Sequence, residues 1–166
     1  LEVGVRVTGL LALAENAVDG ASYRPGDVVT QYGGRTVEIG NTDAEGRIVL
    51  ADALAYADAA LDPTVLVDVA TLTGAARIAL GRSIAPVFAT DPALSAALEA
   101  AGATTGETLW PMPLAQTYRR ALDSDVADVA HIAPGVGGGA VTAALFLREF
   151  VGERPWAHLD IAGTGR

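Results

Sequence analysis

The chain carries the sequence NTDAEGR at residues 41–47, which leads directly into IVLADALAYADAAL at residues 48–61. The second segment combines helical periodicity with strong helix formers, and it therefore predicts a helix that ends before Pro63. The next run, TVLVDVATL at residues 64–72, is rich in β-branched residues, as is typical of a central strand. A helix followed by an apolar strand indicates a fold built from both kinds of element.

The sequence before this stretch predicts further strands. The run Val3–Ala14 alternates and then continues as an apolar stretch, so we expect a strand that is buried on both faces. Two short runs, at residues 28–32 and 35–40, flank the pair Gly33-Gly34, which is typical of a β-hairpin.

The sequence after residue 72 continues the alternation of strands and helices. It has no internal repeat and no low-complexity linker, so we expect a single domain. The order of elements predicts an α/β fold with three layers, in which helices flank a central mixed, largely parallel sheet. We expect strands at residues 84–90 and 156–161, helices at residues 92–103, 114–122 and 140–151, and a glycine-rich loop at residues 134–139.

The composition excludes several classes of protein. Hydrophobic residues make up 51% of the 166 residues and charged residues 19%, which excludes a disordered chain. No uninterrupted apolar run reaches the roughly 18 residues that a membrane span requires, and no secretory signal is visible, so we expect a cytoplasmic protein. The net charge of −9 argues against a surface that binds nucleic-acid phosphates. Cysteine and lysine are both absent, which excludes disulfides, zinc–sulfur sites and lysine chemistry within this chain.

Three charged side chains alternate within the 41–47 stretch: Asp43, Glu45 and Arg47. In an extended backbone, residues two apart project from the same face, so the two carboxylates and the guanidinium would converge. Gly46 would leave the backbone free to approach a ligand. Oxygen ligands of this kind suit Mg²⁺ or Mn²⁺, and Zn²⁺ also accepts them. A solvated acidic loop that caps the following helix would explain the same spacing.

The same stretch and the helix after it closely resemble the signature of the leucyl aminopeptidase (cytosol aminopeptidase) family. The resemblance spans nearly the whole chain, and it implies that residues 1–166 form a partial catalytic domain, truncated at both ends, from the later part of the family's domain. Four more segments resemble family segments in the family's order: Tyr23–Asp27, Ala70–Ala75, Gly137–Ala140 with its AALFL helix, and Trp156–Gly163.

The resemblance implies a two-metal-dependent aminopeptidase that removes N-terminal residues, of leucine type, from peptides. It implies that Asp43 and Glu45 ligate the metals, with Glu45 bridging two divalent ions, Mn²⁺ or Zn²⁺, with Mg²⁺ as a further candidate. It implies that Arg47 is catalytic and holds a bicarbonate ion that acts as general base; a planar guanidinium suits such an anion.

The resemblance also implies a substrate cleft and an assembly. The partners would be peptide substrates and further copies of the same chain in a homohexamer, with no membrane or nucleic acid bound through this segment. The substrate-binding residues would be Thr71, Leu72, Thr73, Gly74 and Ala162.

Family members carry further ligands, a lysine and two aspartates, and a second lysine, in a segment that precedes this chain's first residue. Because this chain has no lysine, we expect the isolated chain to be inactive. A competing hypothesis is a catalytically inert fragment or assembly subunit. A nucleotide-binding module would rest only on the loop at residues 135–139, which lacks the Gly-Lys-Ser/Thr ending of a P-loop.

Four other titratable residues have simpler interpretations. Asp68 and Asp160 lie in apolar strands, and we expect both to be hydrogen-bonded to backbone or helix ends. We expect His158 to be a structural residue within its strand, and His131 to lie on the surface after an acidic, alanine-rich stretch.

Overall fold

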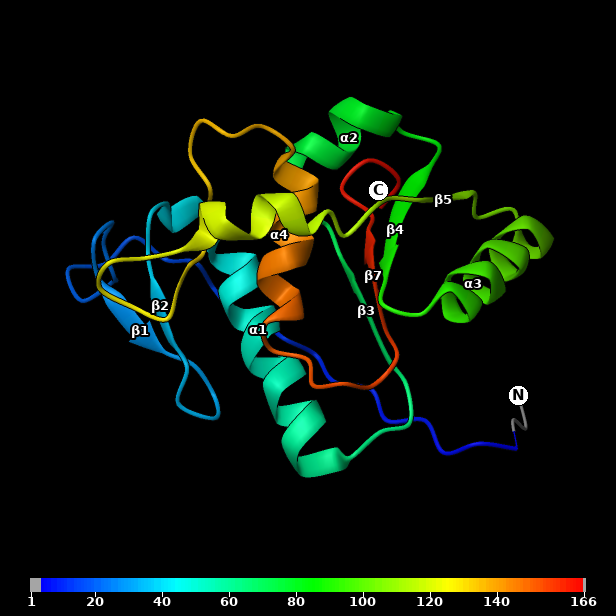
Figure 1. Ribbon diagram of the computed structural model, residues 1–166, viewed down its shortest axis with the longest axis horizontal. Helices are drawn as coiled ribbons and strands as arrows, with labels where there is room; N and C mark the ends of the chain where they lie inside the picture. Colours follow the sequence, from blue (N-terminus) through cyan, green and yellow to red (C-terminus); the bar gives the residue numbers. More distant parts are fainter. Residues whose placement is uncertain (1–3, 166) are drawn as a thin grey trace.

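The computed structural model describes residues 4–165, which form two β-sheets with helices between and around them (Figure 1). The strands are β1 Val28–Thr30, β2 Thr36–Glu38, β3 Leu66–Ala70, β4 Ala85–Ala89, β5 Leu109–Pro111, β6 Val129–Ala130 and β7 Trp156–Asp160. The helices are α1 Glu45–Tyr56, α2 Gly74–Leu80, α3 Pro92–Thr105 and α4 Gly139–Arg148, with the shorter or irregular helices η1 Thr42–Ala44, η2 Ala57–Leu61 and η3 Gln116–Leu122.

Both sheets are mixed. The smaller sheet has the order β1-β2-β6 and the larger one the order β3-β7-β4-β5. The pairs β2/β6, β3/β7 and β4/β5 are parallel, whereas β1/β2 and β4/β7 are antiparallel. The prediction of an α/β fold with a mixed, largely parallel sheet flanked by helices is therefore confirmed, although the strands divide between two sheets.

The predicted hairpin forms as expected. Strands β1 and β2 pair antiparallel with Thr30 opposite Thr36. Gly33 and Gly34 between them have φ angles of 85° and 94°, a conformation that only glycine adopts without strain. The turn therefore requires glycine at both positions, and this pair of glycines is the pattern from which the hairpin was predicted.

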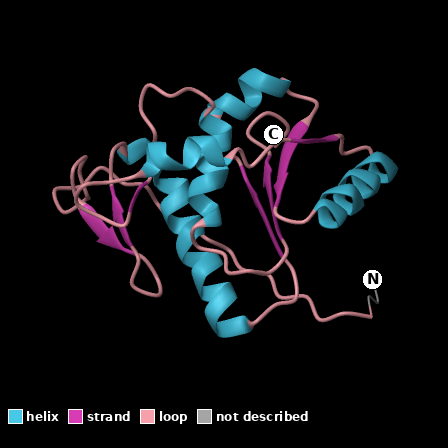
Figure 2. Ribbon diagram, in the orientation of Figure 1, coloured by secondary structure: helices cyan, strands magenta, loops and turns pink. Residues whose placement is uncertain are grey.

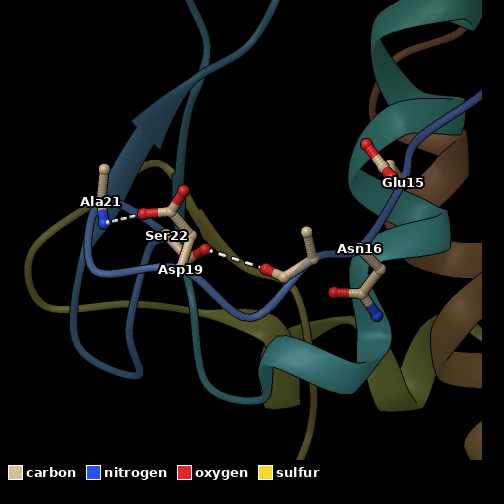
Figure 3. A pocket seen from close by; sticks show the side chains of 6 residues that line it. Glu15, Asn16, Asp19, Ala21 and Ser22 are labelled. Carbon is tan, nitrogen blue, oxygen red and sulfur yellow. Dashed lines mark hydrogen bonds between the residues drawn. The ribbon is translucent and has the colours of Figure 1, made fainter.

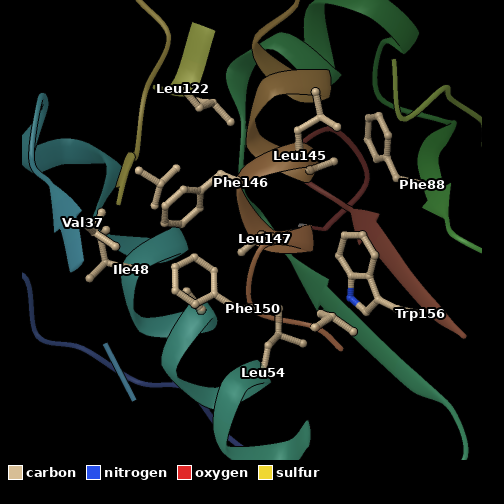
Figure 4. Packing of buried hydrophobic residues seen from close by; sticks show 14 of the residues in the cluster. Val37, Ile48, Leu54, Phe88, Leu122, Leu145, Phe146, Leu147, Phe150 and Trp156 are labelled. Atoms are coloured by element: carbon tan, nitrogen blue, oxygen red, sulfur yellow. The ribbon is translucent and has the colours of Figure 1, made fainter. Parts of the chain in front are cut away.

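Helices α1 and α4 stand between the two sheets (Figure 2). Every residue of α4 from Ala140 to Leu147 is buried, as is typical of a helix that is apolar on all sides and lies in a core. Phe146 points toward Val37 of the smaller sheet, whereas Leu145 lies toward Phe88 and Trp156 of the larger sheet (Figure 4). One helix thus joins the two sheets through a shared core. No helix within residues 4–165 is both long enough and apolar enough to cross a membrane.

The expected N-terminal strand does not form. Residue 3 lies outside the described residues, and residues 4–14 form no strand; their side chains are exposed, with Val7 at 75% and Leu11 at 86%. A strand buried on both faces needs partner strands along its edges and further elements packed on its faces, and no strand in the described residues pairs with this segment. The prediction of a strand at Val3–Ala14 is wrong for this chain.

Other elements differ in extent or kind. The helix expected at residues 48–61 begins earlier, at Glu45, and its last turn, η2, is a π-helix that ends at Asp62 with a left-handed φ of 45°. The helix expected at residues 114–122 is the 3₁₀ helix η3. Helix α2 and the short strands β5 and β6 were not predicted.

Candidate active site

The 41–47 stretch lies at the start of α1 and is not extended. Asn41 has an extended backbone, and its side-chain oxygen accepts the Asp43 N–H at 3.0 Å, which caps the 3₁₀ turn η1. Helix α1 then begins at Glu45. The expectation that Asp43, Glu45 and Arg47 share one face of an extended segment is wrong, because Asp43 lies in the 3₁₀ turn η1 and Glu45 and Arg47 both lie in the first turn of α1.

Burial increases along this stretch. Asp43 is exposed, Glu45 is half-buried, and Arg47 is 9% exposed. The Arg47 Nη1 donates to the His131 carbonyl at 2.7 Å, while Nε is buried without a hydrogen-bond partner in the described residues. Burial lowers the pKa of Arg47 to about 10, and the negative charge of Asp160 opposes that shift. Arg47 therefore remains a cation at neutral pH, with part of its guanidinium unpaired.

The Asp160 carboxylate organises the ends of β3 and β7. It accepts the backbone N–H groups of Leu72 at 3.0 Å and Thr73 at 3.3 Å, and the Thr73 hydroxyl at 2.6 Å. It also accepts the Ala162 N–H at 3.2 Å. Four donors on a buried carboxylate bring two predicted substrate-binding segments, 71–74 and Ala162, together. The expectation that Asp160 is bonded to the backbone is confirmed.

The start of α1 lies next to this loop. A Cβ placed on Gly46 would lie 3.7 Å from Leu72 Cδ1, which is ordinary van der Waals contact. Strands β3 and β7 are parallel, so their carboxyl ends meet at one edge of the sheet. Open α/β sheets bind ligands outside the carboxyl ends of their strands. The candidate site is therefore the junction between that edge and the first turn of α1.

The predicted substrate-binding residues differ in exposure. Thr71 and Gly74 are exposed, Leu72 and Ala162 are half-buried, and Thr73 is buried. The Thr73 hydroxyl also accepts the Ala76 N–H at 3.0 Å and thereby caps α2. Thr73 is thus held on both sides, and Thr71, Leu72 and Gly74 present surface beside it.

The donor set fits a cation in part. One carboxylate oxygen of Glu45, Oε2, is buried without a hydrogen-bond partner in the described residues. A buried carboxylate oxygen of this kind is normally paired, and a metal ion is a suitable partner. Within residues 4–165, however, no group of three or more histidine, aspartate or glutamate side chains could hold a metal ion. Asp43 and Glu45 are by themselves too few to form such a group.

Two hollows lie beside the N-terminal segment. The first is shallow and is lined by residues around Glu15 and Ser22 (Figure 3). The second, of about 490 Å³, extends from Asn16 to Glu45 and Ile48 at the start of α1. Tyr23 also lines it, and burial and the charge of Glu45 raise the pKa of this tyrosine. Glu45 is thus reached from an open cleft.

His131 is buried, so the expectation of a surface histidine is wrong. Its side chain is 0% exposed and lies at the end of β6, where it contacts the backbone just before η1. Burial lowers its pKa, which favours the neutral imidazole. Sequence analysis named this residue but placed it on the surface. The apolar Val129 and Ala130 before it carry the only local signal of a buried strand.

The second histidine lies in the larger sheet and confirms its structural interpretation. His158 Nδ1 lies 2.5 Å from Asp68, whose other oxygen accepts the Trp156 indole N–H at 2.8 Å. The imidazole stacks against both Phe88 and Trp156, with ring centroids 6.0 and 6.4 Å away. Asp68 is therefore bonded to side chains of β7, where bonds to backbone or helix ends were expected.

The comparisons with known proteins agree on one family. The model of the catalytic domain of the cytosol aminopeptidase family matches residues 1–166. The chain is 52% identical over 159 residues to the probable cytosol aminopeptidase of Methylorubrum populi, which covers 96% of this chain and 32% of the relative. It is 55% identical over 159 residues to the corresponding protein of Nitratidesulfovibrio vulgaris, with coverage of 95% and 31%. The chain thus spans about a third of the length of these curated relatives.

A solved structure supports the same conclusion. A mutant of tomato leucine aminopeptidase superposes with a TM-score of 0.86 at 47% sequence identity, over 90% of this chain and 29% of that chain. The similarity thus holds at the level of both sequence and fold. This chain belongs to the cytosol aminopeptidase family.

Proposed function

We propose that this chain is part of the catalytic domain of a cytoplasmic, metal-dependent aminopeptidase that removes N-terminal residues, of leucine type, from peptides. The observation that carries the proposal is a pair of buried polar atoms at the start of α1, Glu45 Oε2 and Arg47 Nε, that have no hydrogen-bond partner in the described residues. The unpaired Glu45 carboxylate and the partly unpaired Arg47 lie at the first turns of α1, beside the loop fixed by Asp160. Family membership supports the same activity.

Asp43 and Glu45 would hold two divalent ions, Mn²⁺ or Zn²⁺, with Glu45 bridging them. Ions bound there would supply Lewis-acid polarisation of the scissile carbonyl. The remaining ligands would come from outside these 166 residues, in keeping with the third of the relatives' length that the chain spans.

Arg47 would bind a small oxyanion, with bicarbonate as the candidate. One guanidinium nitrogen, Nη1, is committed to the His131 carbonyl, and Nε is buried with no partner in the described residues. A planar guanidinium can donate two parallel hydrogen bonds to an oxyanion, and its positive charge strengthens them. An anion held there could accept a proton as general base.

The loop at residues 71–74 and Ala162 would bind the peptide. Asp160 holds both segments through their backbone N–H groups, so the exposed Thr71 and Gly74 and the half-buried Leu72 are carried on a fixed backbone. Leu72 and Ala162 supply an apolar surface for a leucine-type side chain. A homohexamer is the assembly that the family resemblance suggests.

Glu45→Gln in the full-length protein tests the proposal. The substitution keeps the size of the side chain and removes the charge that two cations would share. We expect kcat for L-leucine p-nitroanilide at saturating Mn²⁺ to fall at least a hundredfold, since removal of one electrostatic group costs about that factor or more.

The matched control is Glu107→Gln, since Glu107 is exposed and far along the chain from the site. It should retain the wild-type rate. Wild-type kcat in the Glu45 variant would contradict the bridging role. A full-length wild-type protein without turnover would favour the inert alternative.

A further inference from the structure

His131 lies at the junction between the smaller sheet and α4. Its backbone N–H donates to the Glu38 carbonyl at 3.1 Å, continuing the parallel β2/β6 pairing by one residue. Its ring packs edge-on against Phe146, with the ring centroids 6.5 Å apart. The residue is therefore fixed by a strand on one side and by the central helix on the other.

The imidazole bridges the backbone of two consecutive residues, Gly40 and Asn41, just before η1. Nδ1 lies 3.1 Å from both the Gly40 nitrogen and the Glu38 carbonyl oxygen, and Nε2 lies 2.9 Å from the Asn41 carbonyl oxygen. A carbonyl oxygen can only accept, so in the neutral ring Nε2 carries the proton and donates to Asn41, and Nδ1 accepts the Gly40 N–H. The neutral ring thus satisfies one donor and one acceptor of the backbone.

Gly40 allows the close approach that these bonds need. A Cβ at this position would come within 2.7 Å of the Ile132 side chain, a distance that real Cβ atoms do not show. The segment 131–132 therefore packs directly onto the backbone of residue 40. Close packing of this kind keeps the two ring bonds in place.

The backbone carbonyl of His131 contacts the far end of the 41–47 stretch. It accepts the Arg47 Nη1 at 2.7 Å within the interior. Asn41 in turn caps η1 through the Asp43 N–H. His131 therefore contacts the carbonyl of Asn41, two residues before Asp43, and the side chain of Arg47, two residues after Glu45.

We propose that His131 is a positioning residue that braces the 41–47 stretch from both ends. The inference rests on the proposed function, because it concerns the placement of Asp43, Glu45 and Arg47 for catalysis. The ring fixes the backbone that leads into the two carboxylates. By fixing its own segment, it also fixes the carbonyl that orients the guanidinium.

The test compares His131→Phe with wild type in the full-length protein. Phenylalanine keeps an aromatic ring against Phe146 and removes both ring hydrogen bonds. We expect hydrogen–deuterium exchange of the amides in residues 38–47 to speed at least tenfold. We expect kcat for L-leucine p-nitroanilide to fall ten- to a hundredfold while KM changes less than threefold.

His131→Asn provides the rescue arm. The asparagine oxygen can replace Nδ1 as acceptor for the Gly40 N–H, but its amide is too short to copy the reach of Nε2. We expect an intermediate kcat and exchange that is slower than in the phenylalanine variant. If the phenylalanine variant does not fold, the asparagine variant is compared directly with wild type, and its kcat and its amide exchange in residues 38–47 test the role of His131.

His158→Phe is the matched control, because His158 is the other buried imidazole and lies away from the stretch. It should lower the melting temperature and leave both kcat and the exchange of residues 38–47 within twofold of wild type. Wild-type exchange rates and a wild-type kcat in a folded His131 variant would contradict the positioning role of His131. An equal loss of kcat in the His158 control would contradict it as well. A wild-type protein that does not hydrolyse the substrate would contradict the proposed function. The amide exchange rates would still show whether His131 holds the 41–47 stretch in place.

Discussion

Arg47 is a buried charged residue whose placement points to a role beyond packing. Its guanidinium is buried, one nitrogen is bonded to a backbone carbonyl, and Nε has no partner in the described residues. A buried donor left unpaired costs about 1–3 kcal/mol. Its pKa of about 10 keeps the charge at neutral pH. An anion that accepts from Nε would remove that cost, so the bare site favours anion binding.

The first residue-scale prediction concerns Arg47→Ala in the full-length protein. If Arg47 holds an anionic base, kcat should fall roughly ten- to a hundredfold, since a charge-assisted hydrogen bond is worth about 1.5–3 kcal/mol. The number of Mn²⁺ ions bound should not change. Steady-state kinetics and metal analysis measure the two quantities, at a temperature below the unfolding transition of the variant.

Two further variants sharpen this test. Arg120→Ala removes an exposed arginine and should leave kcat unchanged. Arg47→Lys keeps the charge but loses the planar fork, so it should restore little of the rate. A variant that loses its metals or unfolds would instead show that Arg47 is structural.

The residues of the site could be predicted only in part, and for a physical reason. The stretch NTDAEGR identified Asp43, Glu45 and Arg47, but the argument from an extended backbone was wrong because Asn41 caps a helical turn there. His131 was wrongly placed on the surface because its ring partners, Gly40 and Asn41, lie about 90 residues away along the chain. No local pattern reports a hydrogen bond of that separation.

At the scale of elements, three segments meet at the Asp160 carboxylate. Strand β7 carries it, the end of β3 supplies two N–H donors, and α2 is attached through Thr73, which accepts the Ala76 N–H. The carboxylate also bonds Ala162 in its own loop. The relative placement of both predicted substrate-binding segments therefore depends on a single charged group.

We predict that Asp160→Asn changes substrate binding more than turnover. Asparagine keeps the oxygen that accepts the backbone N–H groups but loses the charge and the acceptor for the Thr73 hydroxyl. The free energy of unfolding should fall by about 1–3 kcal/mol, and KM for L-leucine p-nitroanilide should rise several-fold. Thermal unfolding and steady-state kinetics check this, with the exposed Asp125→Asn as control. An unchanged KM would contradict the role of Asp160.

Elements with a strong local signal were predicted well. The hairpin has its glycine pair, α3 has Asp91 as cap and Pro92 at its start, and β3 has its β-branched residues. Short elements were missed, since β6 is two residues long and is defined only by pairing with β2. The run Val3–Ala14 has a strand pattern, but a strand also needs a partner, which the local sequence does not reveal.

At the scale of the whole molecule, apolar surface lies uncovered along one edge. Strand β3 is the outermost strand of its sheet, and Val65, Val67 and Val69 are 44%, 46% and 55% exposed. Leu11 and Leu13 of the N-terminal segment are exposed as well. Open strand edges and exposed apolar side chains favour association with further protein.

We predict that the isolated 166-residue chain binds Mn²⁺ no more tightly than about 100 µM and does not hydrolyse L-leucine p-nitroanilide. Two carboxylates without further ligands bind divalent ions loosely, and no larger cluster exists within residues 4–165. Calorimetric titration and the amidase assay measure both properties. Sub-micromolar affinity together with turnover would mean that other residues of this chain complete the site.

The start of α1 at Glu45 has an electrostatic consequence. The aligned peptide dipoles of a helix place about half a positive charge at its N-terminus, which stabilises a nearby anion by about 0.3–1 kcal/mol. Asp43 and Glu45 lie at this end, in η1 and in the first turn of α1. The macrodipole therefore offsets part of the repulsion between the two carboxylates before any cation arrives. When α1 folds, the two carboxylates come to lie at a helix end whose partial positive charge offsets part of their negative charge.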